Sequence, residues 1–196
     1  MRSLTTAGIV VGVLALLMIG ACNYNNSFVT AEEDIKQEWS EVETQYQRRA
    51  DLIGNLVETV KGAAEFESST IEAVTAARAR ATSVNVDAGN LTPEALQQFQ
   101  AAQGELSQGL GRLLVAVEAY PELRATAAFR DLMAQLEGTE NRVAVARSRF
   151  NEKVTDYNKK VRVFPGSFFA SIFGFDTWSQ FEADAGSEEA PQVNFD

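Results

Sequence analysis

Histidine is absent from this 196-residue chain, which also contains only one cysteine and four prolines. The absence of histidine removes the commonest general base, metal ligand and phosphoryl acceptor of enzymes. A lone cysteine cannot form an internal disulfide. The scarcity of proline, together with stretches rich in Ala, Gln, Glu, Leu and Arg, is typical of helices rather than sheets. We therefore expect an all-α protein that is not an enzyme and holds no cofactor and no metal.

Positive charge is also scarce, because 17 basic residues stand against 27 acidic residues and the net charge is −10. Proteins that bind nucleic acid use a surplus of Lys and Arg to displace counterions from the phosphates. This chain has no such surplus, so nucleic acid is excluded as a partner. Its length suits one domain with a core of its own.

One long uncharged segment is present, at residues 4–21. As a helix it would extend about 27 Å, the lower limit for crossing the hydrocarbon core of a bilayer. Arg2 precedes the segment and an acidic cluster follows it at residues 32–34. The positive-inside rule then predicts a membrane protein whose body lies outside the cytoplasm, which in a bacterium means the periplasm or the outer side of the membrane.

Cys22 closes this segment after Ile19, Gly20 and Ala21, an arrangement that resembles the lipobox of bacterial lipoproteins. The resemblance implies cleavage before Cys22 and lipidation of its thiol. Asn23 then implies sorting to the outer membrane where a cell has two. The alternative is a single-pass helix in which the cysteine is a small hydrophobic residue. Residues 1–22 are interpreted as a signal or anchor segment.

Apolar residues then recur at steps of three and four, the spacing of helices that pack together in a bundle. The first helix is expected to break near residues 62–67. Ser69 and Glu72 have the spacing of a capping box and predict the start of a second helix. This helix is expected to turn Ile71, Val74, Ala77 and Ala81 inward.

A third helix is predicted after a turn-rich loop at residues 82–91, with Thr92 as its N-cap and Pro93 in its first turn. It is expected to stop before Pro121, because the residue that precedes a proline is pushed out of the α region. Pro121 is expected to open a fourth helix that ends near Arg162. The prediction is an antiparallel up-and-down bundle of about four long helices over residues 23–163.

Arg49 lies on the apolar seam of the first helix, where an unpaired charge would destabilise a bundle by several kcal/mol. If the first and fourth helices are antiparallel, residues whose numbers sum to about 190 face each other. Glu140 or Asn141 would then lie opposite Arg49. We interpret Arg49 and Glu140 as a structural polar pair that fixes the register, with an interaction site as the alternative.

Residues 164–181 form a dense aromatic stretch, and an acidic end expected to be disordered follows at residues 182–196. One interpretation is that the stretch folds over the open end of the bundle. The other is a contact with the membrane or with a partner, because four helices return the chain to the level of its anchor. The residues concerned are Phe168, Phe169, Ile172, Phe173, Phe175 and Trp178.

Several segments resemble the LemA family, and together they extend over almost the whole chain. The most distinctive is the run at residues 45–62, and one departure within it is Gly54, where the family usually carries Pro. Further segments of resemblance lie at residues 24–30, 119–123, 136–147, 164–166, 173–175 and 189–193.

The LemA resemblance implies a helical bundle held at the membrane, with its body outside the cytoplasm and with no established catalytic activity. Some relatives are encoded beside a membrane zinc protease, and one branch is linked to intracellular membrane formation. An envelope protein, such as a membrane protease, is therefore an expected partner, together with the membrane itself.

Three function classes follow from these observations. The first, which we favour, is a membrane-anchored, non-catalytic helical scaffold or adaptor of the bacterial cell envelope. The second is a membrane-shaping or self-assembling homo-oligomer. The third is a hydrolase with an unusual carboxylate site, which would require acidic residues gathered in a pocket.

Overall fold

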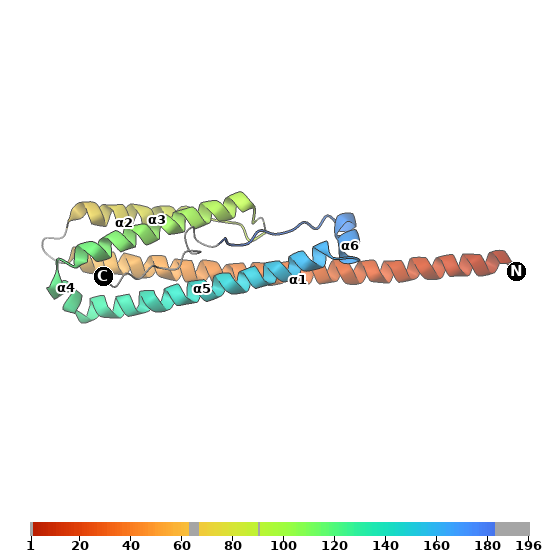
Figure 1. Ribbon diagram of the computed structural model, residues 1–196, viewed down its shortest axis with the longest axis horizontal. Helices are drawn as coiled ribbons and strands as arrows, with labels where there is room; N and C mark the ends of the chain where they lie inside the picture. The colour runs from red at the N-terminus through yellow and green to blue at the C-terminus, as the bar shows by residue number, and fades with distance from the viewer. Residues whose placement is uncertain (1, 63–66, 90, 183–196) are drawn as a thin grey trace, which may run out of the picture.

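The computed structural model describes residues 2–62, 67–89 and 91–182 (Figure 1). All regular structure within these ranges is helical, which confirms the all-α prediction. Two short helices accompany the long ones, α4 (Pro121–Ala125) and α6 (Gly166–Phe173). The long helices are α1 (Arg2–Lys61), α2 (Ser68–Ser83), α3 (Pro93–Val117) and α5 (Ala127–Arg162).

The long helices form an up-and-down bundle, as predicted. α5 lies antiparallel along α1, and α2 and α3 form a second antiparallel pair beside them (Figure 1). α1 is much longer than its partners and protrudes from the bundle at its N-terminal end. We call that end of the bundle proximal and the opposite end, which carries α4, distal. The return of α5 brings α6 back to α1 at the proximal end.

The start of α2 differs from the expected capping box. The residue that precedes the helix is Glu67, and no side chain caps the helix there. Instead, the hydroxyl of Ser69 donates to Oε1 of Glu67 at 2.8 Å. The capping-box prediction was wrong because the helix begins at Ser68, which places Ser69 inside the first turn, where its hydroxyl donates to the Glu67 carboxylate and does not cap a backbone amide. The four residues expected to face inward from α2 are all buried.

Thr92 caps α3 as predicted, since its side chain accepts a hydrogen bond from the Ala95 amide at 3.2 Å. The predicted fourth helix is interrupted. Pro121 opens only the five-residue α4, and Thr126, with an extended backbone at ψ 143°, caps the separate helix α5 by accepting from the Phe129 amide at 3.3 Å. The Thr N-cap therefore outweighs the proline as the start of the last long helix.

The core consists of two apolar clusters with a buried polar layer between them. The proximal cluster includes Phe28, Ile35, Trp39, Phe150 and Tyr157, and the distal cluster includes Ile53, Leu56, Leu106, Leu113 and Leu136. The buried polar residues of the described chain are Gln45, Arg49, Gln103 and Thr139.

Candidate functional site at the proximal end of the bundle

The protruding part of α1 is an apolar helix that no other part of the described structure covers. It is long and apolar enough to cross a membrane, and its most apolar segment is not buried against any other part of the described structure. The exposed side chains include Ile9, Val10, Val11, Leu14, Leu16, Met18 and Ile19. Because water-exposed apolar surface of this extent is costly, the stretch requires a lipid or protein environment.

Cys22 lies within α1, immediately after this apolar stretch, and its side chain is exposed. The first residue of α1 to be fully buried by the bundle is Phe28. The cysteine therefore lies at the boundary between the uncovered stretch and the packed body. Its lipidation stays a prediction.

α6 packs on α1 at this same boundary. The ring of Phe169 stacks on Tyr24 with 4.9 Å between centroids, and a Cβ added at Gly20 would lie 3.8 Å from Cζ of Phe169. The helix begins at Gly166, where an added Cβ would collide with the carbonyl oxygen of Lys160. Only glycine allows α6 to approach the end of α5 so closely.

The structure buries only part of the aromatic stretch against the bundle, and its contact with a membrane or a partner stays a prediction. Phe169 is buried, Phe175 packs on Phe28 with 5.0 Å between centroids, and Trp178 packs on Tyr157 at 6.3 Å. The other three predicted contact residues are exposed: Phe168 by 56%, Ile172 by 59% and Phe173 by 40%. Part of the stretch therefore completes the core, and the outer face of α6 does not.

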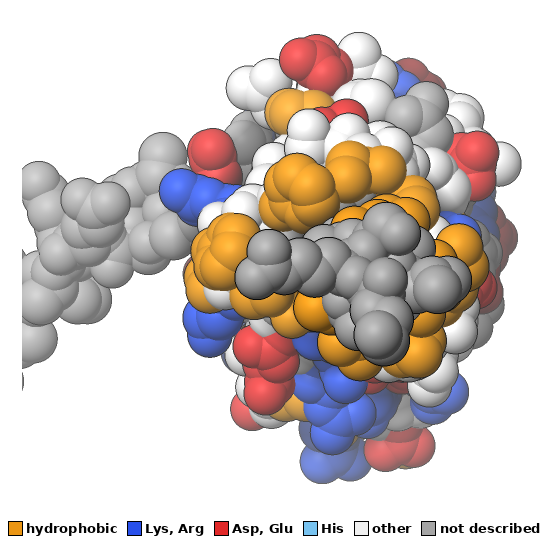
Figure 2. All heavy atoms as spheres, turned by 90° about the vertical axis from the view of Figure 1, so that its right-hand side faces the viewer, with side chains coloured by type: hydrophobic (Ala, Val, Ile, Leu, Met, Phe, Trp, Pro, Cys, Tyr) orange, Lys and Arg blue, Asp and Glu red, His pale blue; other side chains and the backbone are white. Residues whose placement is uncertain are grey.

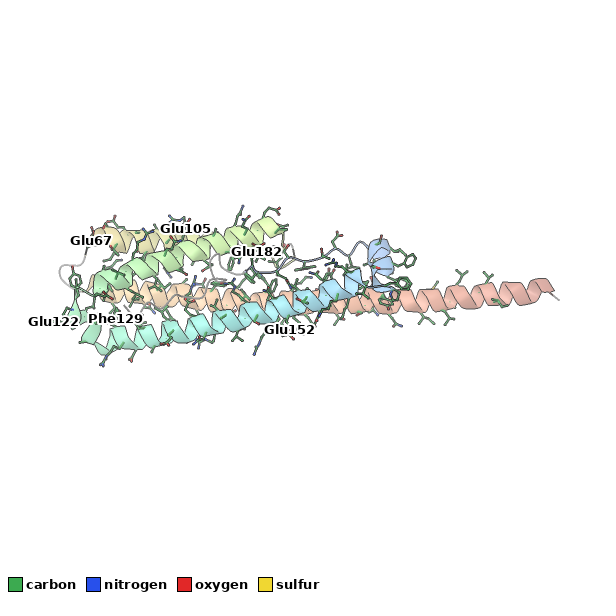
Figure 3. The ribbon with its side chains drawn as sticks, viewed as in Figure 1. Glu67, Glu105, Glu122, Phe129, Glu152 and Glu182 are labelled. Atoms are coloured by element: carbon green, nitrogen blue, oxygen red, sulfur yellow. The ribbon has the colours of Figure 1, made fainter. Side chains whose placement is uncertain are left out.

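An extended tail at residues 174–182 follows α6 and returns along α5 toward the distal end. Two asparagines of α5 hold its backbone. The side-chain amide of Asn158 donates to the Trp178 carbonyl and accepts from the Trp178 amide, both at 2.9 Å. Asn151 pairs in the same way with Phe181, at 3.1 and 2.9 Å. Glu182, the last described residue, lies against α3 and α5 (Figure 3).

The side chain of Phe181 anchors this tail. It is 5% exposed, stacks on Trp39 at 5.9 Å and meets the edge of Phe150 at 5.4 Å. The guanidinium of Arg147 lies 4.9 Å from its ring centroid. Sequence reasoning placed Phe181 in the aromatic stretch but missed the two asparagines. Their separation of seven residues, which puts both on one face of a helix, is the signal that could have found them.

Cations lie beside α6, in the last turn of α5. Lys159, Lys160 and Arg162 are all exposed, and Nζ of Lys159 contacts the Asp156 carboxylate at 3.6 Å. Figure 2, which looks onto this end of the molecule, shows hydrophobic side chains gathered around α1 and a group of Lys and Arg side chains beside them. Cations at a helix C-terminus are favoured by the dipole, so this placement alone does not demonstrate a binding site.

The α1–α5 contact near this end includes a buried hydroxyl. Tyr157 is fully buried and donates to Oε1 of Glu32 at 2.9 Å. Burial, reinforced by this hydrogen bond, raises the pKa of Tyr157 well above its ordinary value. The phenol is therefore neutral throughout the physiological range and serves as a hydrogen-bond donor between the two helices.

Arg49 lies in the polar layer between the two core clusters and is 4% exposed. Its Nη1 lies 3.3 Å from Oε1 of Glu140 and 3.2 Å from the Ser107 hydroxyl. Its Nη2 donates to the side-chain and backbone oxygens of Gln103, at 2.7 and 3.1 Å. The structure thus brings Arg49 and Glu140 together, but the shorter and more buried contact is with Gln103. Glu140 is 49% exposed, so the ion pair itself is partly screened by water.

An apolar groove of about 1020 Å³ lies at the distal end, between α3 and the start of α5. Leu110, Leu114, Phe129 and Met133 contribute to its floor. Three glutamates line it, including Glu140, which already contacts Arg49. The groove lining contains no hydroxyl, thiol or amine nucleophile. Within the described ranges, no three Asp, Glu or Cys side chains gather in a way that could hold a metal ion.

The fold and this proximal end define the class of protein: an all-α bundle that carries one N-terminal helix able to cross a membrane. The LemA family model matches residues 38–195, and the chain belongs to the LemA family. Similar proteins include Magnetosome protein MamQ of Magnetospirillum gryphiswaldense, 30% identical over 190 residues that cover 86% of this chain and 69% of the relative. Magnetosome protein MamQ 1 of Paramagnetospirillum magneticum is 29% identical over 194 residues, 88% of this chain and 70% of the relative.

Proposed function

We propose that this protein is a non-catalytic scaffold of the bacterial cell envelope, anchored in a membrane by the N-terminal part of α1 and carrying its helical body outside the cytoplasm. The observation that supports this most is the continuity of α1. A single helix leads from an uncovered apolar stretch directly into the packed core, so the body is joined to its anchor without a loop. Such a connection suits a protein that holds a binding surface at a fixed place beside the bilayer.

A non-catalytic role is supported by the chemistry of the distal groove. Acyl transfer and related reactions need a nucleophile with an adjacent base, and the lining of this groove offers neither a hydroxyl nor a thiol. A carboxylate hydrolase would need two acids that flank a substrate. Of the three glutamates in the groove, Glu140 is engaged by Arg49 and bridges helices of the bundle, so a hydrolase of this kind would have to use Glu118 and Glu137 as its pair of acids.

The anchoring is tested by fractionating bacterial cells that express the full chain. We expect the protein in the membrane pellet, resistant to alkaline carbonate and released only by detergent. Recovery in the soluble fraction would reject the anchor. Proximity labelling from native membranes would then identify an envelope partner, such as a membrane protease. A cross-linking ladder of the protein with itself would instead support the self-assembling oligomer.

Lipidation of Cys22 is the alternative form of the anchor, because cleavage before Cys22 would remove the apolar stretch of α1. If the thiol carries lipid, the mature chain begins at Cys22, and Cys22→Ala leaves an unprocessed precursor. Mass spectrometry of the purified protein measures both. An intact Met1 N-terminus on the wild-type protein would show that α1 itself is the anchor.

A further inference from the structure

Exposed apolar side chains outside the α1 stretch gather at one place, the turn from α5 into α6 and α6 itself. Phe164 is 81% exposed, Val163 61%, Ile172 59%, Phe168 56% and Phe173 40%. The other large exposed hydrophobics of the described body are single valines on three different helices, Val29, Val115 and Val145. Scattered exposed valines are ordinary, whereas a contiguous aromatic patch marks an interaction surface.

The position of this patch identifies what covers it. Phe169, on the inner face of α6, contacts α1 at Gly20 and Tyr24, directly after the uncovered apolar stretch. If α1 spans the bilayer, the headgroups of the outer leaflet lie at this level, and the same holds if a lipid on Cys22 is the anchor. Either anchor therefore brings the outer face of α6 to the membrane surface.

The composition of the patch fits that surface as well. An interfacial helix buries Phe and other apolar side chains at the boundary between the headgroups and the acyl chains. Lys160 and Arg162, exposed in the adjacent last turn of α5, provide positive charge for lipid phosphates. These cations lie next to the exposed apolar patch in a chain whose net charge is −10.

We propose that α6 is an interfacial helix, which lays Phe164, Phe168 and Ile172 on the headgroup region of the bilayer that holds the N-terminus. This inference rests on the proposed membrane anchoring and adds a second point of contact. One helix leaves a body free to tilt about its anchor. Two contacts, with α6 fixed to the bundle through Gly166 and through the tail bound by Asn151 and Asn158, hold the bundle at a set angle to the membrane.

Tryptophan reporters in the full chain test the proposal. Phe168→Trp and Ile172→Trp each place an indole on the outer face of α6, and Val115→Trp places a matched exposed indole on α3, near the distal end. Trp39 is fully buried, but Trp178 is only partly buried, so quenching of the wild-type protein is measured in the same vesicles and subtracted from that of each variant. Each variant is reconstituted in vesicles of phosphatidylethanolamine and phosphatidylglycerol, with and without bromine on the acyl chains.

We expect brominated lipid to remove most of the added fluorescence at positions 168 and 172 and none at position 115, and aqueous iodide to give the opposite order. Iodide quenching at 168 and 172 equal to that at 115 would overturn the proposal. Protection from both quenchers at 168 and 172 would also overturn it, in favour of a protein that covers the patch. Ile9→Trp separates the two levels of inference. In a chain whose Met1 N-terminus is intact by mass spectrometry, quenching by brominated lipid at position 9 but not at 168 or 172 rejects the α6 contact alone, and its absence at all three positions rejects the anchor. In a chain that begins at Cys22, flotation with the vesicles without quenching at 168 or 172 rejects the α6 contact alone, and failure to float rejects the anchor.

Discussion

Substitution of Arg49 tests whether the polar layer stabilises the bundle as the structure suggests. Arg49→Met keeps the length of the side chain but leaves the side-chain oxygen of Gln103, a residue only 6% exposed, without its donor at 2.7 Å. A buried acceptor without a partner costs about 1–3 kcal/mol. The Gln103 carbonyl keeps the hydroxyl of Ser107 at 3.1 Å, so it adds little to the loss. The half-exposed Glu140 loses a pair that contributes less than about 1 kcal/mol.

These magnitudes predict an order among three variants. For a chain of this size about 1 kcal/mol corresponds to a shift of about 2–4 °C in Tm. Glu140→Gln is expected to change Tm least and Arg49→Met to lower it clearly. Arg49→Met combined with Gln103→Leu is expected to recover most of the loss, since both ends of the buried contact are then apolar. Thermal unfolding in detergent, followed by far-UV circular dichroism, measures the series. An unchanged Tm for Arg49→Met, or equal losses for Arg49→Met and Glu140→Gln, would refute the reasoning.

Three further predictions concern the tail at residues 174–182, the pH dependence of stability and the close approach of α6 to the end of α5. Asn151→Ala and Asn158→Ala each remove two hydrogen bonds to the tail, and each bond contributes about 0.5–1.5 kcal/mol. Both variants are therefore expected to exchange the backbone amide hydrogens of residues 175–182 faster than the wild-type protein. Asn141→Ala, on the same helix, is the neutral control. Partial burial raises the pKa of the Glu43 carboxyl above 4.5, so the folded state binds the carboxyl proton more tightly than the unfolded state does. The protonated carboxyl therefore contributes to the free energy of unfolding at low pH, and this contribution is lost as the pH rises through the raised pKa. Glu43→Gln is therefore expected to raise Tm at neutral pH and to lose this advantage below pH 4.5, and an equal advantage at both pH values would contradict the assignment. Gly166→Ala is expected to displace α6 and expose Phe169, measured as faster exchange in α6, and unchanged exchange would show that the close approach to α5 is not required.

The long helices could be predicted from the sequence because their apolar period is long and their boundaries carry strong local signals. Thr92 with Pro93 marked the start of α3, and the structure has the expected cap. Weaker signals failed where two local rules compete. Pro121 and Thr126 are both good helix starts, and the structure uses both, the proline for the short α4 and the threonine cap for the long α5.

The proximal site could be predicted only in part, because tertiary contacts decide which side of an aromatic stretch is buried. Composition identified the aromatic stretch at residues 164–181. An even number of long antiparallel helices before it predicted that the stretch returns to the level of the anchor. No local pattern distinguishes Phe168 from Phe169, since one is exposed and the other stacks on Tyr24 only once α6 meets α1. The antiparallel register similarly placed Glu140 opposite Arg49. The contact with Gln103 depends on how α3 lies beside α1, which helix periodicity does not specify.

Protease digestion of intact spheroplasts tests the central claim most directly, that a membrane anchor holds the helical body outside the cytoplasm. The full chain is expressed with a C-terminal epitope tag, and protease is added either to intact spheroplasts or to lysed ones. The account predicts that the tag is lost in both samples while a cytoplasmic control protein is lost only after lysis. A tag that survives in intact spheroplasts and disappears only after lysis would contradict it.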